Sequence, residues 1–453
     1  MTDSGLAPAC LFPGFDGLDA PDWLRRLLAE GLGGVVLFAR NVRDPEQLAA
    51  LTASLRAEQP DLLIAIDEEG GDVTRLEAAT GSSFPGNLAL GAVDDTALTR
   101  RVAAALGGEL ASVGVNLDLA PVADVIVDPA NPIVGVRSFG ADPQLVARHV
   151  AAFVEGLQGV GVAACAKHFP GHGETVADSH LELPTAEADR ETLERRALPP
   201  FGAAVAAGVR AVMTGHIRFP ALDEEAATLS GPVIGLLRSE LRFDGMVMTD
   251  ALEMRAISGT VGLVDGAVRA LTAGADALCL GADRSPEETA GVLDAIRRVP
   301  EERLRDAARR VAELAAWASS PKPHHDLDAG GEAARQAVLV EGDVSLARQP
   351  VVVELWPEAT IAAGEARHGL GELLGAETFR LREGETLPRL DGRPVVVVRD
   401  AHRHAWQRAL VPPGAVVVET GVPVWRPDGA RGYVASHGAG RANLQAVADV
   451  LRR

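Results

Sequence analysis

The sequence predicts an α/β protein in which a (β/α)8 barrel of the TIM type is followed by a small C-terminal α/β domain. Short apolar runs alternate with helical patterns eight times, and most of the runs end in polar side chains. A Pro-rich segment then precedes a different, Gly-rich pattern. Eight strand–helix units favour a closed parallel barrel. A doubly wound sheet can show the same alternation, but eight full repeats favour closure.

The eight runs are short and rich in β-branched residues, as buried parallel strands are. They are Ala7–Phe12, Gly34–Phe38, Leu62–Ile66, Val115–Leu119, Val162–Ala166, Ala211–Met213, Met246–Met248 and Asp276–Leu280. Helix-start signals lie between them, because Asp44, Asp142 and Ser285 each precede a proline. Gly114 and Gly274 are positioned to end helices. Barrel enzymes carry their functional side chains at the carboxyl ends of such strands.

Residues 1–318 are therefore predicted to form the barrel, residues 319–328 a linker, and residues 329–453 the small α/β domain. The linker prediction depends on the Pro- and His-rich segment Ser319–Asp326. The second domain is predicted from further strand-like runs, which are Val351–Leu355, Val395–Val398 and Ala415–Glu419. A length of 453 residues suits two or three domains.

Composition limits the partners and the compartment. The net charge is 43 − 63 = −20, so electrostatics favours neither nucleic acid nor an anionic membrane as a partner. The three cysteines lie in apolar runs and are expected to be packed thiols. The amino terminus lacks a basic and an apolar signal region, and no apolar run could span a membrane. We expect a cytoplasmic protein, and no sequence feature indicates its oligomeric state.

One polar loop stands out among the strand ends. It begins at Lys167-His168, directly after an apolar run, and continues through a Pro- and Gly-rich stretch to Asp178-Ser179-His180. Long loops in compact domains are typically lids or binding loops. The mixture of lysine, histidine and carboxylate side chains suits proton transfer and hydrogen bonding to hydroxyl groups better than it suits packing.

This loop resembles glycoside hydrolase family 3, and more narrowly its β-N-acetylglucosaminidase branch, here in a two-domain form. The family carries K-H-[FI]-P-G-[HD]-G followed by D-[ST]-H, and both parts are present, at Lys167–Gly173 and Asp178–His180. The second part is specific to the branch. Three further segments are similar to family motifs, namely Ile66–Leu76, Val136–Gly140 and Met248–Met254.

The resemblance implies a role for each matching residue. Asp250 matches the nucleophile, and Ala251 stands where many members have a second aspartate. His180 matches the general acid/base, and Asp178 would orient its imidazole and stabilise the protonated form. The implied sugar-contacting residues are Asp67, Arg75, Arg137, Lys167 and His168. Structural roles alone are expected for Asn41 and Asp118. His172 is expected to shape the loop, and His216, at a strand end, to line the floor of the pocket.

The activity implied by the resemblance is that of a retaining exo-β-N-acetylglucosaminidase. It would act on small-molecule glycosides such as cell-wall fragments, form a covalent glycosyl-enzyme and need no metal or cofactor. Phosphate as the acceptor in place of water, and a β-glucoside as the substrate, remain alternatives.

Two other classes compete with this interpretation. A metal-dependent barrel hydrolase could draw its ligands from His168, His172, His180, His216 and Asp250. That class usually begins with an H-x-H pair on the first strand, and the first run here has no histidine. A sugar-binding sensor without activity would have no need for Asp250, Asp178 and His180 together.

Overall fold

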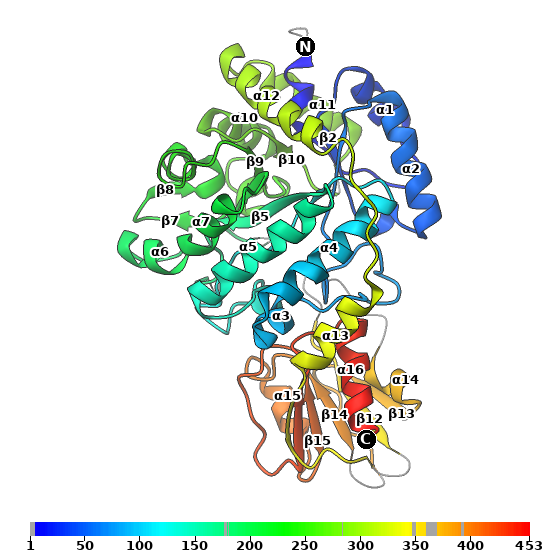
Figure 1. Cartoon of the computed structure of the whole chain (residues 1–453). Helices are drawn as coiled ribbons and strands as arrows, with labels where there is room; N and C mark the ends of the chain where they lie inside the picture. Colours follow the sequence, from blue (N-terminus) through cyan, green and yellow to red (C-terminus); the bar gives the residue numbers. More distant parts are fainter. Residues whose placement is uncertain are drawn as a thin grey trace.

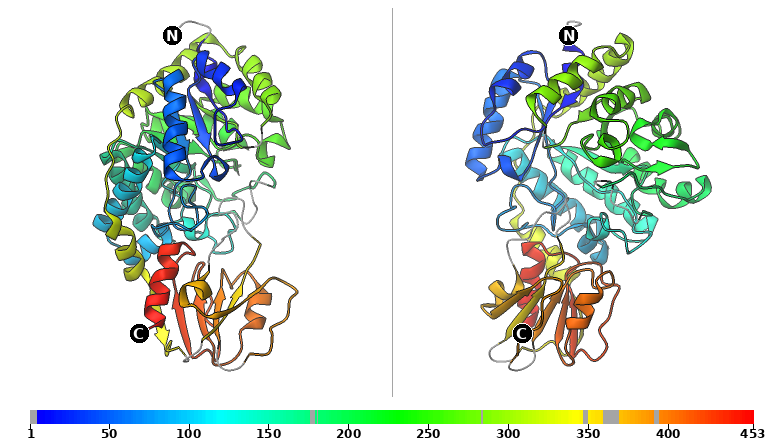
Figure 2. Two further views of the ribbon diagram at one scale, coloured as in Figure 1. Left: turned by 90° about the vertical axis from the view of Figure 1, so that its right-hand side faces the viewer. Right: turned by 180° about the vertical axis from the view of Figure 1, so that it is seen from behind.

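The computed structural model describes residues 5–175, 179, 181–282, 284–346, 350–358, 369–390 and 394–453. These residues form two regions, each built on a β-sheet, that lie one above the other in Figures 1 and 2. The strands at 11–279 belong to the first region, and those from 339 onward form the sheet of the C-terminal region (residues 329–453). Among the described residues, no helix is both long enough and apolar enough to cross a bilayer.

Six parallel strands form a half-barrel sheet in the first region, in the order β2-β3-β4-β5-β6-β9. Their bounds are Gly34–Leu37, Leu63–Ile66, Leu117–Asp118, Ala163–Phe169, Ala211–Thr214 and Met246–Thr249. A parallel pair accompanies them, made of β1 (Leu11–Phe12) and β10 (Leu278–Cys279). Each of the eight predicted runs contains or overlaps one of these strands, so the strand predictions are confirmed.

The pair β1–β10 is linked to both ends of the six-stranded sheet. On the β2 side, Val36 N–H donates to the Pro13 carbonyl at 3.1 Å. On the β9 side, Met248 and Ala277 form a parallel bridge. An antiparallel hairpin, β7 (Arg218–Phe219) with β8 (Asp223–Ala226), was not predicted. Its second strand carries three acidic residues in a row and thus lacks the apolar run by which a strand is recognised.

Helices connect these strands. They are α1 (Asp22–Ala29), α2 (Pro45–Glu58), α3 (Asn87–Val93), α4 (Thr96–Ser112), α5 (Pro143–Gly159), α6 (Arg190–Arg196), α7 (Leu198–Ala206), α8 (Gly231–Gly235), α9 (Arg255–Ser258), α10 (Leu263–Ala273), α11 (Pro286–Ile296) and α12 (Glu301–Trp317). The predicted starts are confirmed at Asp44, Asp142 and Ser285, whose side chains accept hydrogen bonds from the first turns of α2, α5 and α11.

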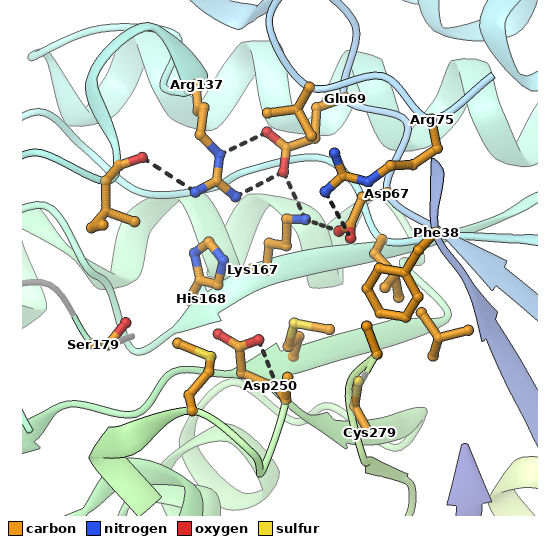
Figure 3. Close-up of a pocket in the computed structure, with 18 of the residues that line it drawn as sticks. Phe38, Asp67, Glu69, Arg75, Arg137, Lys167, His168, Ser179, Asp250 and Cys279 are labelled. Atoms are coloured by element: carbon orange, nitrogen blue, oxygen red, sulfur yellow. Dashed lines mark hydrogen bonds and ion pairs between the residues drawn. The ribbon is translucent and has the colours of Figure 1, made fainter. Parts of the chain in front are cut away.

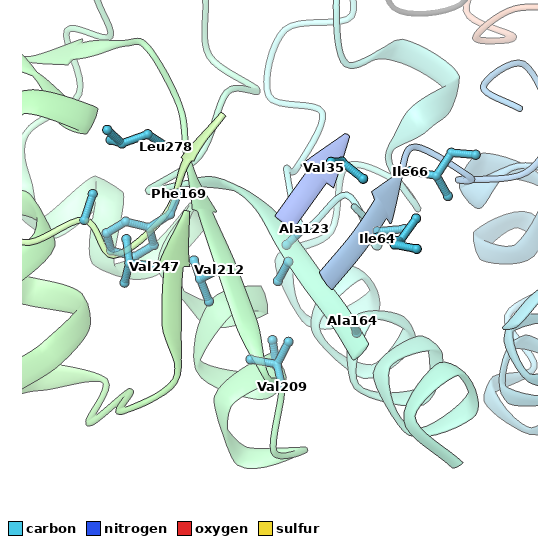
Figure 4. Close-up of a cluster of buried hydrophobic side chains, with 14 of the residues drawn as sticks. Val35, Ile64, Ile66, Ala123, Ala164, Phe169, Val209, Val212, Val247 and Leu278 are labelled. Atoms are coloured by element: carbon cyan, nitrogen blue, oxygen red, sulfur yellow. The ribbon is translucent and has the colours of Figure 1, made fainter. Parts of the chain in front are cut away.

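The core divides into two layers because side chains alternate along each strand. Val35 and Ile64 belong to the cluster that packs under the helices, part of which Figure 4 shows. Their neighbours Val36 and Ala65 belong to a second cluster, together with Met248. The cysteines Cys10, Cys165 and Cys279 are free and buried, as expected of packed thiols.

The C-terminal region contains a second six-stranded sheet, in the order β11-β16-β15-β14-β12-β13. Its strands are β11 (Leu339–Gly342), β12 (Val351–Leu355), β13 (Glu377–Leu381), β14 (Val395–Val398), β15 (Val416–Glu419) and β16 (Gly432–Ala435). Its helices are α13 (Leu327–Ala337), α14 (Leu370–Leu374), α15 (Ala405–Leu410) and α16 (Arg441–Leu451). The three predicted strands are β12, β14 and β15.

The sequence analysis did not predict β11, β13 and β16. β11 and β13 are edge strands whose side chains are exposed or half-buried. β16 is buried, but it begins with a glycine and its apolar run is only Tyr433–Ala435. Helix α13 begins inside the predicted linker, with Asp326 as its N-cap. It contacts α3 and α4 of the first region and α16 of its own, so it lies at the junction seen in Figure 1.

Candidate active site

A cavity of about 380 Å³ opens at the carboxyl ends of the parallel strands. Figure 3 shows several of the side chains that line it. The sequence-predicted residues among them are Asp67, Arg75, Arg137, Lys167, His168, His172 and Asp250. Phe38, Glu69, Ser179 and Glu253 also line it. Segments far apart in the sequence therefore deliver the predicted sugar-contacting residues and Asp250 to one place, at the carboxyl ends of the parallel strands.

A network of opposite charges forms one wall of the cavity (Figure 3). Lys167 Nζ lies 2.7 Å from Asp67 Oδ1 and 2.7 Å from Glu69 Oε1. Arg137 donates to Glu69 through Nε at 2.9 Å and Nη2 at 2.8 Å. Arg75 Nη2 lies 3.5 Å from Asp67 Oδ2. Glu69 was not predicted to belong to the site, although its place between Asp67 and a glycine pair could have indicated such a role.

Each charge in the network stabilises its neighbours in the ionised form. Burial alone would raise the pKa of Asp67 and of Glu69, but the cations beside them hold both below their ordinary values. For Asp67 these are Lys167 and Arg75, and for Glu69 they are Arg137 and Lys167. Burial would likewise lower the pKa of Lys167, and the two carboxylates raise it instead. The wall is thus a fixed set of charged donors and acceptors suited to a ligand rich in hydroxyl groups.

Asp124 holds the two histidines of the polar loop. Its Oδ2 lies 2.7 Å from His168 Nδ1, and its Oδ1 accepts the backbone N–H of His172 at 2.7 Å. A neutral His168 that donates from Nδ1 has Nε2 as an acceptor. Asp124 was missed by the sequence analysis because it is separated from His168 by 44 residues and lies in no recognised motif.

His172 shapes the loop through both ring nitrogens. Nε2 lies 3.1 Å from Ser179 Oγ and Nδ1 lies 3.0 Å from Thr175 Oγ1. Burial lowers the pKa of His172 to about 4, so the ring is neutral at neutral pH. His216 lies outside the cavity lining and reaches Ala251 O with Nε2 at 3.0 Å. The contacts of His172 agree with a role in shaping the loop, whereas His216 is not among the residues that line the cavity, where it was expected.

Asp250 follows β9 on the side of the cavity opposite the Arg137–Glu69 pair (Figure 3). Its backbone N–H donates to Thr214 O at 3.1 Å, and its Oδ1 accepts the Ala251 N–H at 2.7 Å. These bonds orient a half-buried carboxylate toward the cavity. A carboxylate held in this way can act as a nucleophile or as an electrostatic partner for a developing cation.

The predicted acid/base pair, Asp178 and His180, lies outside the described residues. Ser179, which stands between them in the sequence, is described and lines the cavity beside His172. The other predicted site residues belong to the described part of the chain and line the cavity.

Within the part of the chain that the structure describes, no three His, Cys, Asp or Glu side chains are grouped as metal ligands. His168 is instead held by Asp124, and His216 by Thr228 at 2.8 Å and by Ala251. The metal-hydrolase alternative therefore gains no support from the described ligand candidates.

Two buried carboxyl groups support the wall from behind. Glu68 Oε2 accepts the N–H groups of Arg75 at 2.8 Å and Leu76 at 3.0 Å, which fixes the segment that carries Arg75. Asp118 Oδ1 accepts the Glu68 N–H at 3.0 Å, a structural role as expected. Asn41 is structural too, since its Nδ2 donates to the Phe15 carbonyl at 3.0 Å. Burial raises the pKa of Glu68 to about 7.

Comparisons with known proteins agree on one family. Residues 20–314 match the sequence profile described as the glycosyl hydrolase family 3 N-terminal domain. A beta-hexosaminidase of Thiobacillus denitrificans is 36% identical over 349 residues, which are 75% of this chain and 94% of that protein. Beta-hexosaminidase A of Pseudoalteromonas piscicida is 36% identical over 316 residues, 62% of this chain, and the chain spans about half (53%) of its length.

Solved structures extend the likeness to the C-terminal region. A glycoside hydrolase family 3 β-N-acetylglucosaminidase from Paenibacillus sp. superposes with a TM-score of 0.90 at 34% identity, covering 100% of this chain and 96% of that one. NagZ from Neisseria gonorrhoeae superposes with a TM-score of 0.60 at 30% identity over 71% of this chain and 92% of its own. A beta-glucoside phosphorylase, at 18% identity and a TM-score of 0.78, covers 100% of this chain and 92% of its own and shares the fold.

We predict that Glu68→Gln stabilises the protein at neutral and alkaline pH. The folded state raises the pKa of Glu68 from 4.5 to about 7, so ionisation of this carboxyl group opposes folding. That penalty is absent below pH 4.5, grows between pH 4.5 and 7, and is then constant. A glutamine carbonyl can still accept both backbone N–H groups without the penalty.

Unfolding by urea, followed from pH 4.5 to 8, measures the effect. We expect the unfolding free energy of the variant, relative to the parent, to rise across this range by up to about 3 kcal/mol. A difference that is independent of pH would contradict the raised pKa of the buried Glu68 carboxyl group.

Proposed function

The chain belongs to glycoside hydrolase family 3, and we propose that it is a retaining exo-β-N-acetylglucosaminidase that releases terminal β-linked N-acetylglucosamine. The observation that carries the proposal is the position of Asp250, which faces the Asp67–Lys167–Glu69–Arg137 wall across a single cavity. The wall offers hydroxyl-binding groups on one side, and the carboxylate offers a nucleophile on the other. The chain spans 94% of the length of a relative named beta-hexosaminidase, which supports the same activity.

For the fold, we propose a closed (β/α)8 barrel over residues 1–318, a linker at 319–328 and an α/β domain at 329–453. The hydrogen bond between Val36 and Pro13 and the bridge between Met248 and Ala277 support closure, because they join the pair β1–β10 to both ends of the sheet. Closure explains why residues after β3, in β5 and after β9 can share one cavity.

In the first step of the proposed mechanism, an oxygen of Asp250 forms a bond to the anomeric carbon while the bond to the leaving oxygen breaks. Positive charge develops on the sugar, and the ionised carboxylate stabilises it. The leaving oxygen takes a proton from His180, whose imidazolium form Asp178 would stabilise. The N–H group of Ala251, 2.7 Å from Asp250 Oδ1, keeps the nucleophile in position.

In the second step, a water molecule attacks the anomeric carbon and gives its proton to the neutral His180. The bond between the sugar and Asp250 breaks, and the carboxylate is restored. Throughout both steps, Asp67, Arg75, Arg137, Lys167 and His168 would hold the ring hydroxyls. Two displacements at one carbon retain the configuration of the sugar.

For the substrate, we propose a cell-wall fragment that ends in N-acetylglucosamine, handled in the cytoplasm during cell-wall recycling. A cavity of about 380 Å³ is near the lower end of the range for small-molecule sites, which supports cleavage of terminal sugars. The structure of NagZ from Neisseria gonorrhoeae holds N-trifluoroacetyl-D-glucosamine, which supports an N-acylated glucosamine as the terminal sugar. The three free cysteines are compatible with a reducing compartment.

Phosphate is the second candidate for the acceptor, and the charges of the site favour water. The cations that line the cavity are Arg40, Arg75, Arg137 and Lys167, and the described anions are Asp67, Glu69, Asp250 and Glu253. These charges sum to zero, 4 − 4, and Lys167 and Arg137 are already paired with carboxylates. A phosphate dianion would therefore meet no excess of positive charge among the described side chains that line the cavity.

We predict that the purified protein hydrolyses p-nitrophenyl β-N-acetylglucosaminide much faster than the matching β-glucoside. Initial rates on the two substrates, in phosphate and in a non-phosphate buffer at equal pH and ionic strength, measure both the substrate preference and the acceptor. Free N-acetylglucosamine, formed at a rate indifferent to phosphate, is the expected product. N-acetylglucosamine 1-phosphate would establish the phosphorylase alternative, and faster cleavage of the glucoside would refute the proposed specificity.

We predict that Asp250→Ala lowers kcat by about 10⁴-fold while the fold is kept, because a nucleophile is lost from a polar strand end. Asp244→Ala, at the exposed loop before the same strand, is the control and should retain activity. A fluorinated glycoside with a good leaving group should label Asp250 covalently in the parent. Mass spectrometry that maps the label to a different residue would overturn the assignment.

We predict that His180→Ala slows cleavage of substrates with poor leaving groups far more than cleavage of activated aryl glycosides, because only the former need protonation. Asp178→Ala should show the same pattern more weakly. The comparison uses a disaccharide and a p-nitrophenyl glycoside with each variant. Equal losses on both substrates would exclude His180 as the general acid.

A further inference from the structure

The turn that follows Glu69 is held from outside the barrel, by the C-terminal region. Asp72 Oδ1 accepts the Ala439 N–H at 2.6 Å, and Arg399 Nη1 forms an ion pair with Asp72 Oδ2. The side chain of Asp72 is only 4% exposed, so both partners meet a buried carboxylate. Asp72 does not line the cavity and is separated from Ala439 by 367 residues.

Backbone contacts reinforce these bonds. A Cβ atom added to Gly440 would lie 2.9 Å from the Cα atom of Gly71, closer than such atoms approach one another. Just beyond, Arg441 Nη2 lies 2.6 Å from Glu77 Oε1, and Ala442 N–H donates to Ser82 O at 3.1 Å. The start of α16 therefore packs against the segment between β3 and α3.

A second contact supports the segment that carries Arg137. Val422 of the C-terminal region packs with Ile126, Val134 and Val136 of the first region in one buried cluster. His402 Nε2 lies 2.7 Å from the Pro129 carbonyl. The space left between the two regions behind Glu69 and Arg137 measures only about 10 Å³, which holds at most about one water molecule.

These contacts matter because the turn is built on a glycine pair. Gly70 has φ of 77° and Gly71 has φ of 59°, and ordering glycine costs a large conformational entropy. Within the first region, backbone hydrogen bonds hold the turn, from Glu69 N–H to Val73 O at 3.0 Å and from Gly71 N–H to Phe84 O at 2.8 Å. Asp72, directly after the glycines, adds an anchor from the C-terminal region between Glu69 and Arg75.

We propose that the C-terminal region is a positioning element for the sugar site, acting through Asp72 and through the Val422 contact on the loops of Glu69, Arg75 and Arg137. The inference rests on the proposed function of that site as the place where the sugar binds. No residue of the C-terminal region needs to touch the sugar. Its part is to hold two loops in the geometry that binds the ring hydroxyls.

The test compares two arginines of the C-terminal region that pair with buried carboxylates. Arg399 pairs with Asp72 at the junction, whereas Arg380 Nε donates at 2.9 Å to Glu354, a side chain only 1% exposed within the C-terminal sheet. Arg399→Ala and Arg380→Ala should lower Tm alike, because each leaves a buried charge without its partner. Arg399→Lys restores a cation at the junction.

Kinetics should separate the two variants. On p-nitrophenyl β-N-acetylglucosaminide, well below both Tm values, we expect Arg399→Ala to lower kcat/KM by about tenfold, chiefly through KM. Arg399→Lys should recover part of the loss, and Arg380→Ala should match the parent. Unchanged kcat and KM in Arg399→Ala, at an equal loss of Tm, would overturn the positioning role.

Hydrogen–deuterium exchange gives a readout that does not depend on turnover. Peptides covering residues 69–76 should exchange faster in Arg399→Ala than in the parent, and at the parent's rate in Arg380→Ala. Equal exchange in all three proteins would refute the inference. Absence of turnover in the parent would refute the proposed function instead, and the exchange result would still decide the positioning role.

Gly440→Ala is a second, steric test. Gly440 has φ of −59°, which alanine adopts without strain, so the added methyl group acts only by displacing Gly71. Gly291→Ala, in α11, is its control, because a Cβ atom there meets nothing within 4 Å. We expect Gly440→Ala to raise KM and the exchange at residues 69–76, and Gly291→Ala to change neither. Parental KM and exchange in Gly440→Ala would contradict the proposal.

Discussion

The ammonium group of Lys167, buried between two carboxylates, is the interaction on which the rest of the site depends. Its side chain is 2% exposed, and burying an unpaired cation would cost several kcal/mol. Asp67 and Glu69, each 2.7 Å from Nζ, offset that cost only while β3 and β5 keep their places in the sheet. The strand arrangement and the charge network therefore require one another.

The same network explains how a chain with a net charge of −20 can present cations to a ligand. Arg137 makes a bidentate pair with Glu69, and Arg75 approaches Asp67, so the positive groups are held by carboxylates of the wall itself. The lining charges balance, which suits a neutral, hydroxyl-rich sugar better than an anion. On the opposite side, Asp250 lies across the cavity from this wall, which is the arrangement that the proposed glycoside cleavage needs.

The charged wall is held by contacts from both regions of the chain. From within the barrel, Glu68 holds the backbone of Arg75, and Asp124 holds both His168 and the backbone of His172. From outside, the C-terminal region binds Asp72, directly after a pair of glycines with positive φ. Among the described residues, those that line the cavity all belong to the first region, so the contribution we propose for the C-terminal region is an indirect one.

The sequence by itself determined the parallel strands of the first region and most of the charged residues that line the cavity. Buried parallel strands are continuous apolar runs, and this local signal located the eight parallel strands of that region, although not the hairpin β7–β8. Family motifs then named Asp67, Arg75, Arg137, Lys167, His168 and Asp250, which the structure brings into one cavity. The predicted roles of Asp178 and His180 stay predictions.

Only the tertiary structure decided which of these groups pair. Lys167 meets Asp67 across 100 residues, Asp124 meets His168 across 44, and Asp72 meets Ala439 across 367. The edge strands β11 and β13 could not be predicted from the sequence either, since their exposed or half-buried side chains form no buried apolar run. In each case the stabilising partner lies far along the chain, so no local pattern of residues could reveal the contact before the chain was folded.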